Sequence, residues 1–168
     1  MMLFKGRANK DISIRISEIR ETTMEEYINA PPQAVWDCIS DVRNYHKWAT
    51  LFKAFPPEGL ERVEKPGDTV GYETAIMGIP FRGKIVTLER VPPVRSAFYL
   101  LSEYRGGGEY LLEPLNEGTR VHYRIWSEIP ASYLGEVVDR VAIAGTARKR
   151  MGEHLTGLKK YVEGLLEK

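Results

Sequence analysis

Acidic side chains are the first residues in this sequence to consider for chemistry. Glu73, Glu89, Glu103, Glu109 and Glu113 could supply general acid or base catalysis if one of them faced an interior with a raised pKa. Strand-like alternation places at least Glu73, Glu109 and Glu113 on an outer, solvated face. We therefore predict no catalytic residue among them.

Three tyrosines fall on the opposite face of the same strand-like segments. Tyr72, Tyr110 and Tyr123 each combine an apolar ring with a hydrogen-bonding hydroxyl. Side chains of this kind, converging from separate strands, could line a pocket for a largely apolar ligand. The aliphatic residues that we expect beside them are Ile76, Ile85 and Ile125.

An aromatic segment supplies two further candidate ligand contacts, Trp48 and Phe52. They lie between Tyr45 and Phe55, just before Pro56 and Pro57. This segment could be a mobile lid over the mouth of a cavity, or a plug that packs on the sheet. The sequence leaves both alternatives open.

Other kinds of site are excluded by residue counts and spacing. One cysteine, Cys38, rules out an internal disulfide framework and a cysteine-based zinc site. His46, His122 and His154 are too far apart to suggest metal ligands, so we expect neither a metal nor a cofactor. The run from Gly106 to Gly108 resembles a phosphate loop only in composition, because a strand and not a helix follows it, and a hairpin turn is the better prediction.

Length and charge indicate a single domain spanning residues 1–168. With 24 basic and 23 acidic residues, the chain has no general charge that would attract nucleic acid or anionic lipid. It lacks an apolar run long enough for a signal peptide or a membrane span, which predicts a cytoplasmic protein without integral membrane association. Residues 1–20 form an N-terminal extension, in which alternation from Ile12 to Ile16 indicates a possible extra strand.

Most of the chain is predicted to form an antiparallel meander. After a strand ending at Ile28, Pro31 and Pro32 begin a short helix, and Asp41 can cap a second one. Turn-forming residues then separate six further strands. These strands are Gly59 to Lys65, Thr69 to Met77, Pro80 to Val91, Arg95 to Glu103, Gly108 to Leu115 and Thr119 to Glu128. The expected fold is α+β, with about seven strands curled around a helix.

The last element is a long helix from Ala131 to Lys168, with apolar residues at three- and four-residue steps. A straight helix of that length would span roughly 50 Å, so we expect a bend near Gly145 or Gly152. Small residues in its middle would leave space against the sheet, where Arg148 could pair with a ligand carboxylate or a buried glutamate. The helix residues predicted to line this space are Val138, Val141, Ala142, Gly145 and Arg148.

The order of these elements resembles the helix-grip fold of the START/Bet v 1-like (SRPBCC) superfamily. Four stretches are similar to its polyketide cyclase/dehydrase and coenzyme-Q-binding branch: Ile28 to Ala49, Pro66 to Asp68, Glu113 to Arg124 and Leu155 to Gly164. The resemblance implies a cavity between sheet and helix that receives a lipid, quinone or polyketide-like molecule.

Three functions are compatible with this resemblance. The first is a carrier or binding protein for a hydrophobic small molecule. The second is an enzyme of the aromatase/cyclase kind, which would need an inward carboxylate or arginine near a tyrosine hydroxyl. The third is an interaction module with a protein partner of the chaperone- or ribosome-associated type, whose interior would be filled by its own side chains.

Overall fold

The computed structural model describes the backbone of residues 19–76, 78–102, 104–128 and 140–168. Within these ranges, the side chains of residues 19, 20 and 140–143 are outside the description. The elements are β1 (Ile19–Ile28), α2 (Pro32–Ser40), the 3-10 helix η1 (Val42–Lys47), β2 (Lys53–Phe55), β3 (Thr69–Ile76), β4 (Ile79–Val91), β5 (Arg95–Leu101), β6 (Arg105–Leu115), β7 (Gly118–Glu128) and α4 (Arg140–Leu166).

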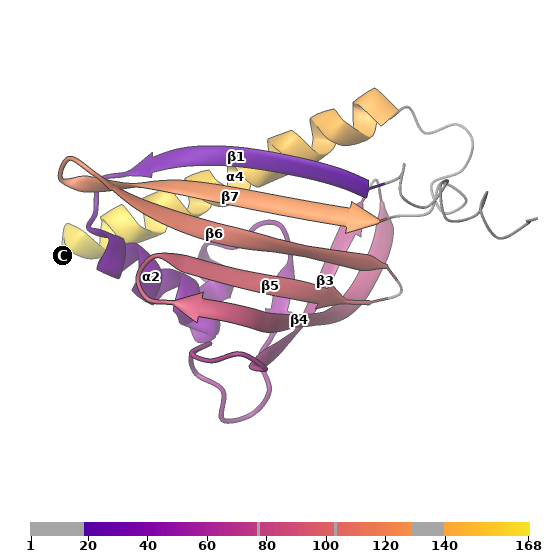
Figure 1. The fold of residues 1–168 in the computed structure, drawn as a ribbon, viewed down its shortest axis with the longest axis horizontal. Coiled ribbons are helices and arrows are strands. Elements are labelled where there is room, and N and C mark those ends of the chain that lie inside the picture. The colour runs from indigo at the N-terminus through magenta and orange to yellow at the C-terminus, as the bar shows by residue number, and fades with distance from the viewer. Residues whose placement is uncertain (1–18, 77, 103, 129–139) are drawn as a thin grey trace, which may run out of the picture.

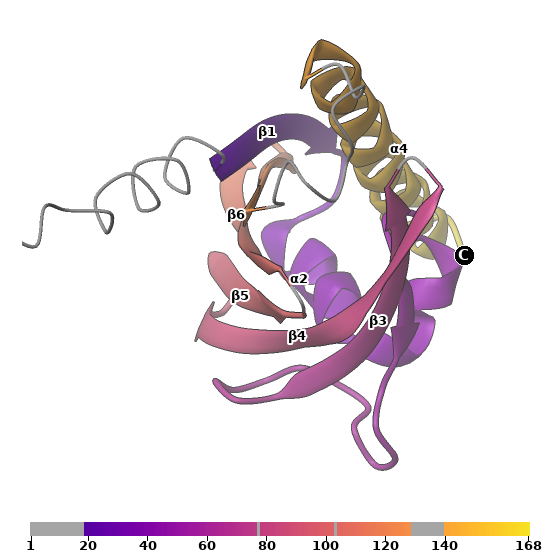
Figure 2. The same ribbon diagram turned by 90° about the vertical axis from the view of Figure 1, so that its right-hand side faces the viewer.

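The strands form one antiparallel sheet in the order β1-β7-β6-β5-β4-β3-β2. Figure 1 shows α4 passing behind β1, β7 and β6 of this curled sheet, with α2 at one end of the curl. Figure 2 looks along the curl and shows α4 crossing between the two sides of the sheet, near β1 and β3. The predicted helix-grip architecture is confirmed.

Local signals in the sequence explain the two short helices. Proline fixes a helical φ and lacks an N–H that the first turn would leave unbonded, and α2 begins with Pro32 at this position. Asp41 caps η1, because its side chain accepts a hydrogen bond from the Arg43 N–H. Trp36 of α2 is 4% exposed and anchors the helix in the core, as its apolar spacing predicts.

Two predictions about strands are wrong. The stretch from Gly59 to Lys65 is not a strand, and its only bridge pairs Arg62 with Asp41; β2 supplies the seventh strand instead. The glycines from 106 to 108 lie inside β6 and not in a turn. A Cβ on Gly108 would lie 2.7 Å from the ring of Phe98, so large neighbouring side chains occupy the space that glycine leaves.

Helix α4 continues through both glycines at which a bend was expected. The described helix has 27 residues and is therefore only about 40 Å long, which removes the reason for a break. Its buried stripe is formed by Met151, Leu155, Leu158 and Val162.

The outer edge of β1 is bonded to side chains of α4. Lys159 Nζ donates to the carbonyl of Tyr27 at 2.6 Å, and the Asn29 N–H donates to Glu163 Oε1 at 2.8 Å. Lys159 and Glu163 also pair with each other at 2.8 Å. These contacts hold the C-terminal half of the helix along the strand.

Several predictions lie outside the described residues. They concern the strand from Ile12 to Ile16, the start of the last helix at Ala131, and Val138. The backbone of Val141 and Ala142 is helical, but their side chains are outside the description. Within the described ranges, no helix is both long and apolar enough to cross a membrane.

Candidate functional site

The inward face of the sheet is the one that alternation predicts. Tyr110 lies opposite Tyr123, and Tyr123 lies opposite Met24 in the antiparallel register. The Met24 side chain reaches toward Gly152 of α4. Paired residues share a face, so all three point toward the helix. The register places the other predicted strand residues on this same face: Tyr72, Ile76, Ile85 and Ile125.

This interior is sealed at one end and accessible to solvent at the other. On β7, Val121 and Tyr123 are buried, whereas Ile125 is partly exposed. β1 shows the same change, since Ile28 is fully buried and Thr22 is partly exposed. Helix α2 packs on β6 and β7 over the buried end. Solvent therefore reaches the inward face where β1 begins and β7 ends.

A fully buried histidine lies at the sealed side of this interior. His154 Nδ1 accepts a hydrogen bond from the Thr50 N–H at 3.2 Å, and its Nε2 is 2.8 Å from the Tyr110 hydroxyl. The hydroxyls of Tyr110 and Tyr123 interact in turn, and their rings stack at 4.3 Å. We call Thr50, His154, Tyr110 and Tyr123 the histidine network.

The histidine network carries no charge near neutral pH. Burial, together with the positive charge of Arg150, lowers the pKa of His154 to about 3. Burial also raises the pKa of Tyr110 and of Tyr123 above the ordinary range. Because Nδ1 accepts from a backbone N–H, the proton of the neutral ring is on Nε2 and points to Tyr110. A base this weak takes up little proton from a substrate at neutral pH.

Trp48 belongs to the core and does not form a mobile flap. It is 3% exposed, and its ring lies 5.0 Å from that of His154 and 5.1 Å from that of Tyr45. Phe52 is partly exposed and lies 6.5 Å from Tyr72 between ring centroids. For these two residues the structure favours the plug over the lid.

Arg148 and Gly145 are not enclosed. Arg148 precedes the buried Leu155 by seven residues and so shares its helical face, but its side chain is exposed. Gly145 is exposed too, with no atom within 4 Å of the position of a Cβ. The prediction that Arg148 points into the interior is wrong, since the first turns of α4 rise away from β1 (Figure 1).

Arg150, which the sequence did not single out, makes the contact expected of Arg148. It donates to the carbonyls of Ala75 and Leu51 and to Thr74 Oγ1, the last two at 2.8 and 3.0 Å. Arg150 thus ties α4 to β3 and to the segment after Trp48. His154 was also missed, although a lone histidine within an apolar helical stripe was a visible signal.

Replacing Arg150 by methionine should lower the free energy of unfolding by about 1.5 kcal/mol, because three carbonyl and hydroxyl oxygens lose a charged donor. Arg148→Met is the matched control two residues away and should change it by less than about 0.5 kcal/mol. Urea denaturation followed by tryptophan fluorescence measures both. Equal effects of the two variants would contradict the assignment.

Residues 20–163 match the protein family described as polyketide cyclase/dehydrase and lipid transport. The chain belongs to this family. The family is part of the START/Bet v 1-like superfamily, whose fold binds hydrophobic ligands. A search of curated proteins gave no match.

Solved structures share this family's fold at low sequence identity. The protein TTHA0849 from Thermus thermophilus is 20% identical over 87% of this chain and 99% of its own, with a TM-score of 0.71. A START superfamily protein from Mycobacterium smegmatis is 14% identical over 88% and 98%, with a TM-score of 0.64. A major latex-like protein from Panax ginseng is 12% identical over 86% and 97%, also with a TM-score of 0.64.

The outer face of the sheet is covered by cross-strand ion pairs. Arg95 contacts Glu89 at 2.5 Å and Glu109 at 2.7 Å. His122 lies between Glu25 and Glu113, at 2.8 and 3.1 Å. The predicted outward orientation of Glu73, Glu109 and Glu113 is confirmed, since Glu73 pairs with Arg82. These carboxylates are thus unavailable to the interior.

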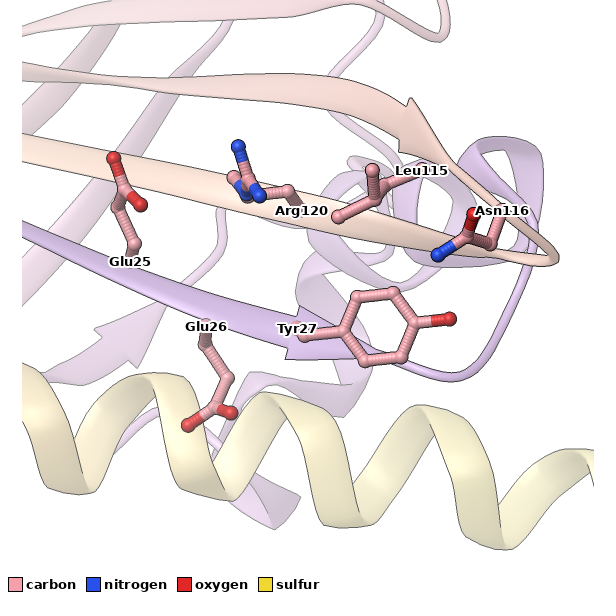
Figure 3. A pocket seen from close by; sticks show the side chains of 6 residues that line it. All are labelled: Glu25, Glu26, Tyr27, Leu115, Asn116 and Arg120. Atoms are coloured by element: carbon pink, nitrogen blue, oxygen red, sulfur yellow. The ribbon is translucent and has the colours of Figure 1, made fainter.

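A surface pocket of this family member lies at the turn between β6 and β7. Figure 3 shows the side chains that line it: Glu25, Glu26, Tyr27, Leu115, Asn116 and Arg120. Three of the six are charged. Its lining is unlike the apolar and aromatic inward face, which remains the candidate site for a hydrophobic ligand.

Proposed function

We propose that this protein binds a hydrophobic small molecule, such as a lipid, quinone or polyketide-like compound, between the curled sheet and α4. The observation that carries the proposal is that inward-facing apolar side chains stay partly exposed. Phe98 and Leu100 of β5 and Ile125 of β7 share this property, on the two strands that flank β6. Apolar surface that solvent can reach in a concave face favours an apolar ligand.

Binding is favoured over catalysis by the chemistry of the polar groups. His154 is neutral and weakly basic, and the pKa of each neighbouring tyrosine is raised by burial. None of the carboxylates that the structure describes makes a hydrogen bond to the network. The one inward arginine among the described residues of β4, Arg90, donates to the hydroxyls of Ser96 and Ser40 and not to that of a tyrosine. The described residues therefore lack the carboxylate or arginine at a tyrosine hydroxyl that the alternative enzyme function requires.

Ligand binding can be tested on the purified full chain. Native mass spectrometry should reveal a co-purified small molecule, and oleic acid or a short-chain ubiquinone should raise the melting temperature by mass action. The proposal fails if the protein emerges without a bound molecule and neither probe changes the melting temperature.

A variant that fills the interior locates the site. Ile125→Trp places a large ring on the inward face of β7 and should weaken binding of the same probe at least about tenfold, since overlap with the ligand costs more than about 1.4 kcal/mol. Leu111→Trp adds the same ring to the outer face of β6, where Leu111 is 40% exposed, and should leave affinity unchanged. Equal affinities for the two variants would place the ligand elsewhere.

A further inference from the structure

The turn between β3 and β4 is apolar and projects beyond the neighbouring strand. Residues 75–80 include no polar or charged side chain, whereas turns are ordinarily rich in Asn, Asp and Ser beside Gly and Pro. β4 begins at Ile79 but pairs with β5 only from Lys84 onward. Ala75 and Pro80, which pair across this hairpin, are both exposed. The tip of the hairpin therefore offers apolar surface to its surroundings.

This hairpin lies at the end of the sheet where solvent reaches the inward face. Ile76 and Ile79 pack against Phe81 and Tyr104, whose rings lie 5.2 Å apart and join the hairpin to the turn between β5 and β6. Leu101, at the end of β5, is 54% exposed. Figure 2 looks onto this end and shows the hairpin beside α4. We call its exposed and partly exposed apolar residues the apolar rim: Ala75, Ile76, Ile79, Pro80 and Leu101.

Exposed cations lie beside the apolar rim. Lys84 and Arg105 are the register partners of Leu101 on its two sides, and both are exposed. Arg148 and Lys149 are exposed in the turn of α4 that is bonded to the β3–β4 hairpin. Within the described ranges, none of these cations forms an ion pair.

Carboxylates offset only part of this positive charge. Glu73 is already paired with Arg82 at 2.6 Å. The described carboxylates that remain at this end without an ion pair are Glu128, the last residue of β7, and Glu153, one helical turn further along α4. Cations thus outnumber carboxylates among the described residues here, although the whole chain has a net charge of only +1.

We propose that this end of the protein docks on an anionic lipid surface, with the apolar rim inserted between the headgroups. Apolar side chains enter the boundary of headgroups and acyl chains, and neighbouring cations are attracted to anionic headgroups. Charge favours this partner over a second copy, because a two-fold contact through the same end brings like cations together. The inference goes beyond the proposed function, since docking needs no bound ligand. It also places the open end of the interior against the bilayer.

Vesicle flotation with the full chain tests this docking. Vesicles of phosphatidylcholine and phosphatidylserine in equal parts should bind the protein at least about tenfold more tightly than vesicles of phosphatidylcholine alone, because several cations each contribute to the attraction. Raising the salt concentration should reduce this preference by screening.

A substitution in the apolar rim locates the contact. Leu101→Glu removes apolar surface and adds a negative charge, and should weaken binding to the mixed vesicles at least about tenfold. Leu88→Glu is the matched control, since Leu88 is 57% exposed and lies in the second half of β4, away from this end. It should leave vesicle binding unchanged. The double variant Lys84→Gln/Arg105→Gln keeps the rim and should lose most of the preference for phosphatidylserine.

The outcomes separate docking from ligand binding. If the wild type binds neither kind of vesicle, docking is overturned, whereas the hydrophobic site is judged by its own probes. In that case, a wild type that is dimeric in sedimentation velocity beside a monomeric Leu101→Glu identifies a second copy as the occupant. If Leu101→Glu and Leu88→Glu bind the mixed vesicles equally well, the lipid contact lies elsewhere and the inference is overturned too.

Discussion

Replacing Gly157 by valine should lower the free energy of unfolding by about 3 kcal/mol, the upper part of the usual range for overpacking. A Cβ at this position would lie 2.5 Å from the carbonyl oxygen of Trp48. That oxygen is main chain and cannot rotate away, so the segment after η1 must move off α4. Thr50 would then leave His154, and ligand affinity should fall with stability.

Gly145→Val is the matched control on the same helix. Gly145 is exposed, and a Cβ added to it would have no atom within 4 Å. The substitution should therefore change stability by less than about 0.5 kcal/mol, valine and glycine being similar helix formers. Denaturant titration of both variants decides the matter. Comparable losses would mean that Gly157 does not mark a close approach.

The stability of the wild-type protein should fall by about 2 kcal/mol more than that of His154→Gln between about pH 7 and pH 5. The unfolded histidine has a pKa near 6.5, whereas burial lowers the pKa of His154 to about 3 in the folded protein. Between these values the unfolded state binds more protons, so stability is full above the upper pKa and decreases as the pH falls. The total loss by about pH 3 is about 4 kcal/mol.

Glutamine suits this test because its amide can accept from Thr50 and donate to Tyr110 without titrating. Chemical denaturation at a series of pH values measures the difference between the two proteins, in which carboxylates common to both cancel. His46→Gln provides the control, since His46 is exposed and its loss should leave the pH dependence of the wild type intact. A constant difference between wild type and His154→Gln across this range would refute a buried neutral imidazole.

Period-two alternation was sufficient to predict the inward side of the sheet. Tyr72, Tyr110, Tyr123 and Ile125 face α4 because each strand exposes one side to the helix and the other to water. Whether these residues contact a ligand stays a prediction. Alternation failed at Gly106 to Gly108, where the deciding factor is the size of side chains on adjacent strands, which spacing within one segment does not reveal.

The polar centre of the site could not be predicted for a different reason. His154 and Thr50 are 104 positions apart, and the contact between them depends on where η1 meets α4. Which of Arg148 and Arg150 contacts β3 also depends on segments far away in the sequence. Helical spacing favoured Arg148, but its side chain is exposed in the structure. Arg150 instead reaches the carbonyls of Ala75 and Leu51.

The bonds from Lys159 and Glu163 to the main chain beside Ile28 bear on how these molecules behave at high concentration. An unprotected outer strand offers its amides and carbonyls as a template to a strand from another molecule. Here one carbonyl and one amide near the end of β1 are already occupied by side chains of the same chain. Edge-to-edge pairing of sheets from different molecules, which leads to aggregation, is thereby hindered at this edge.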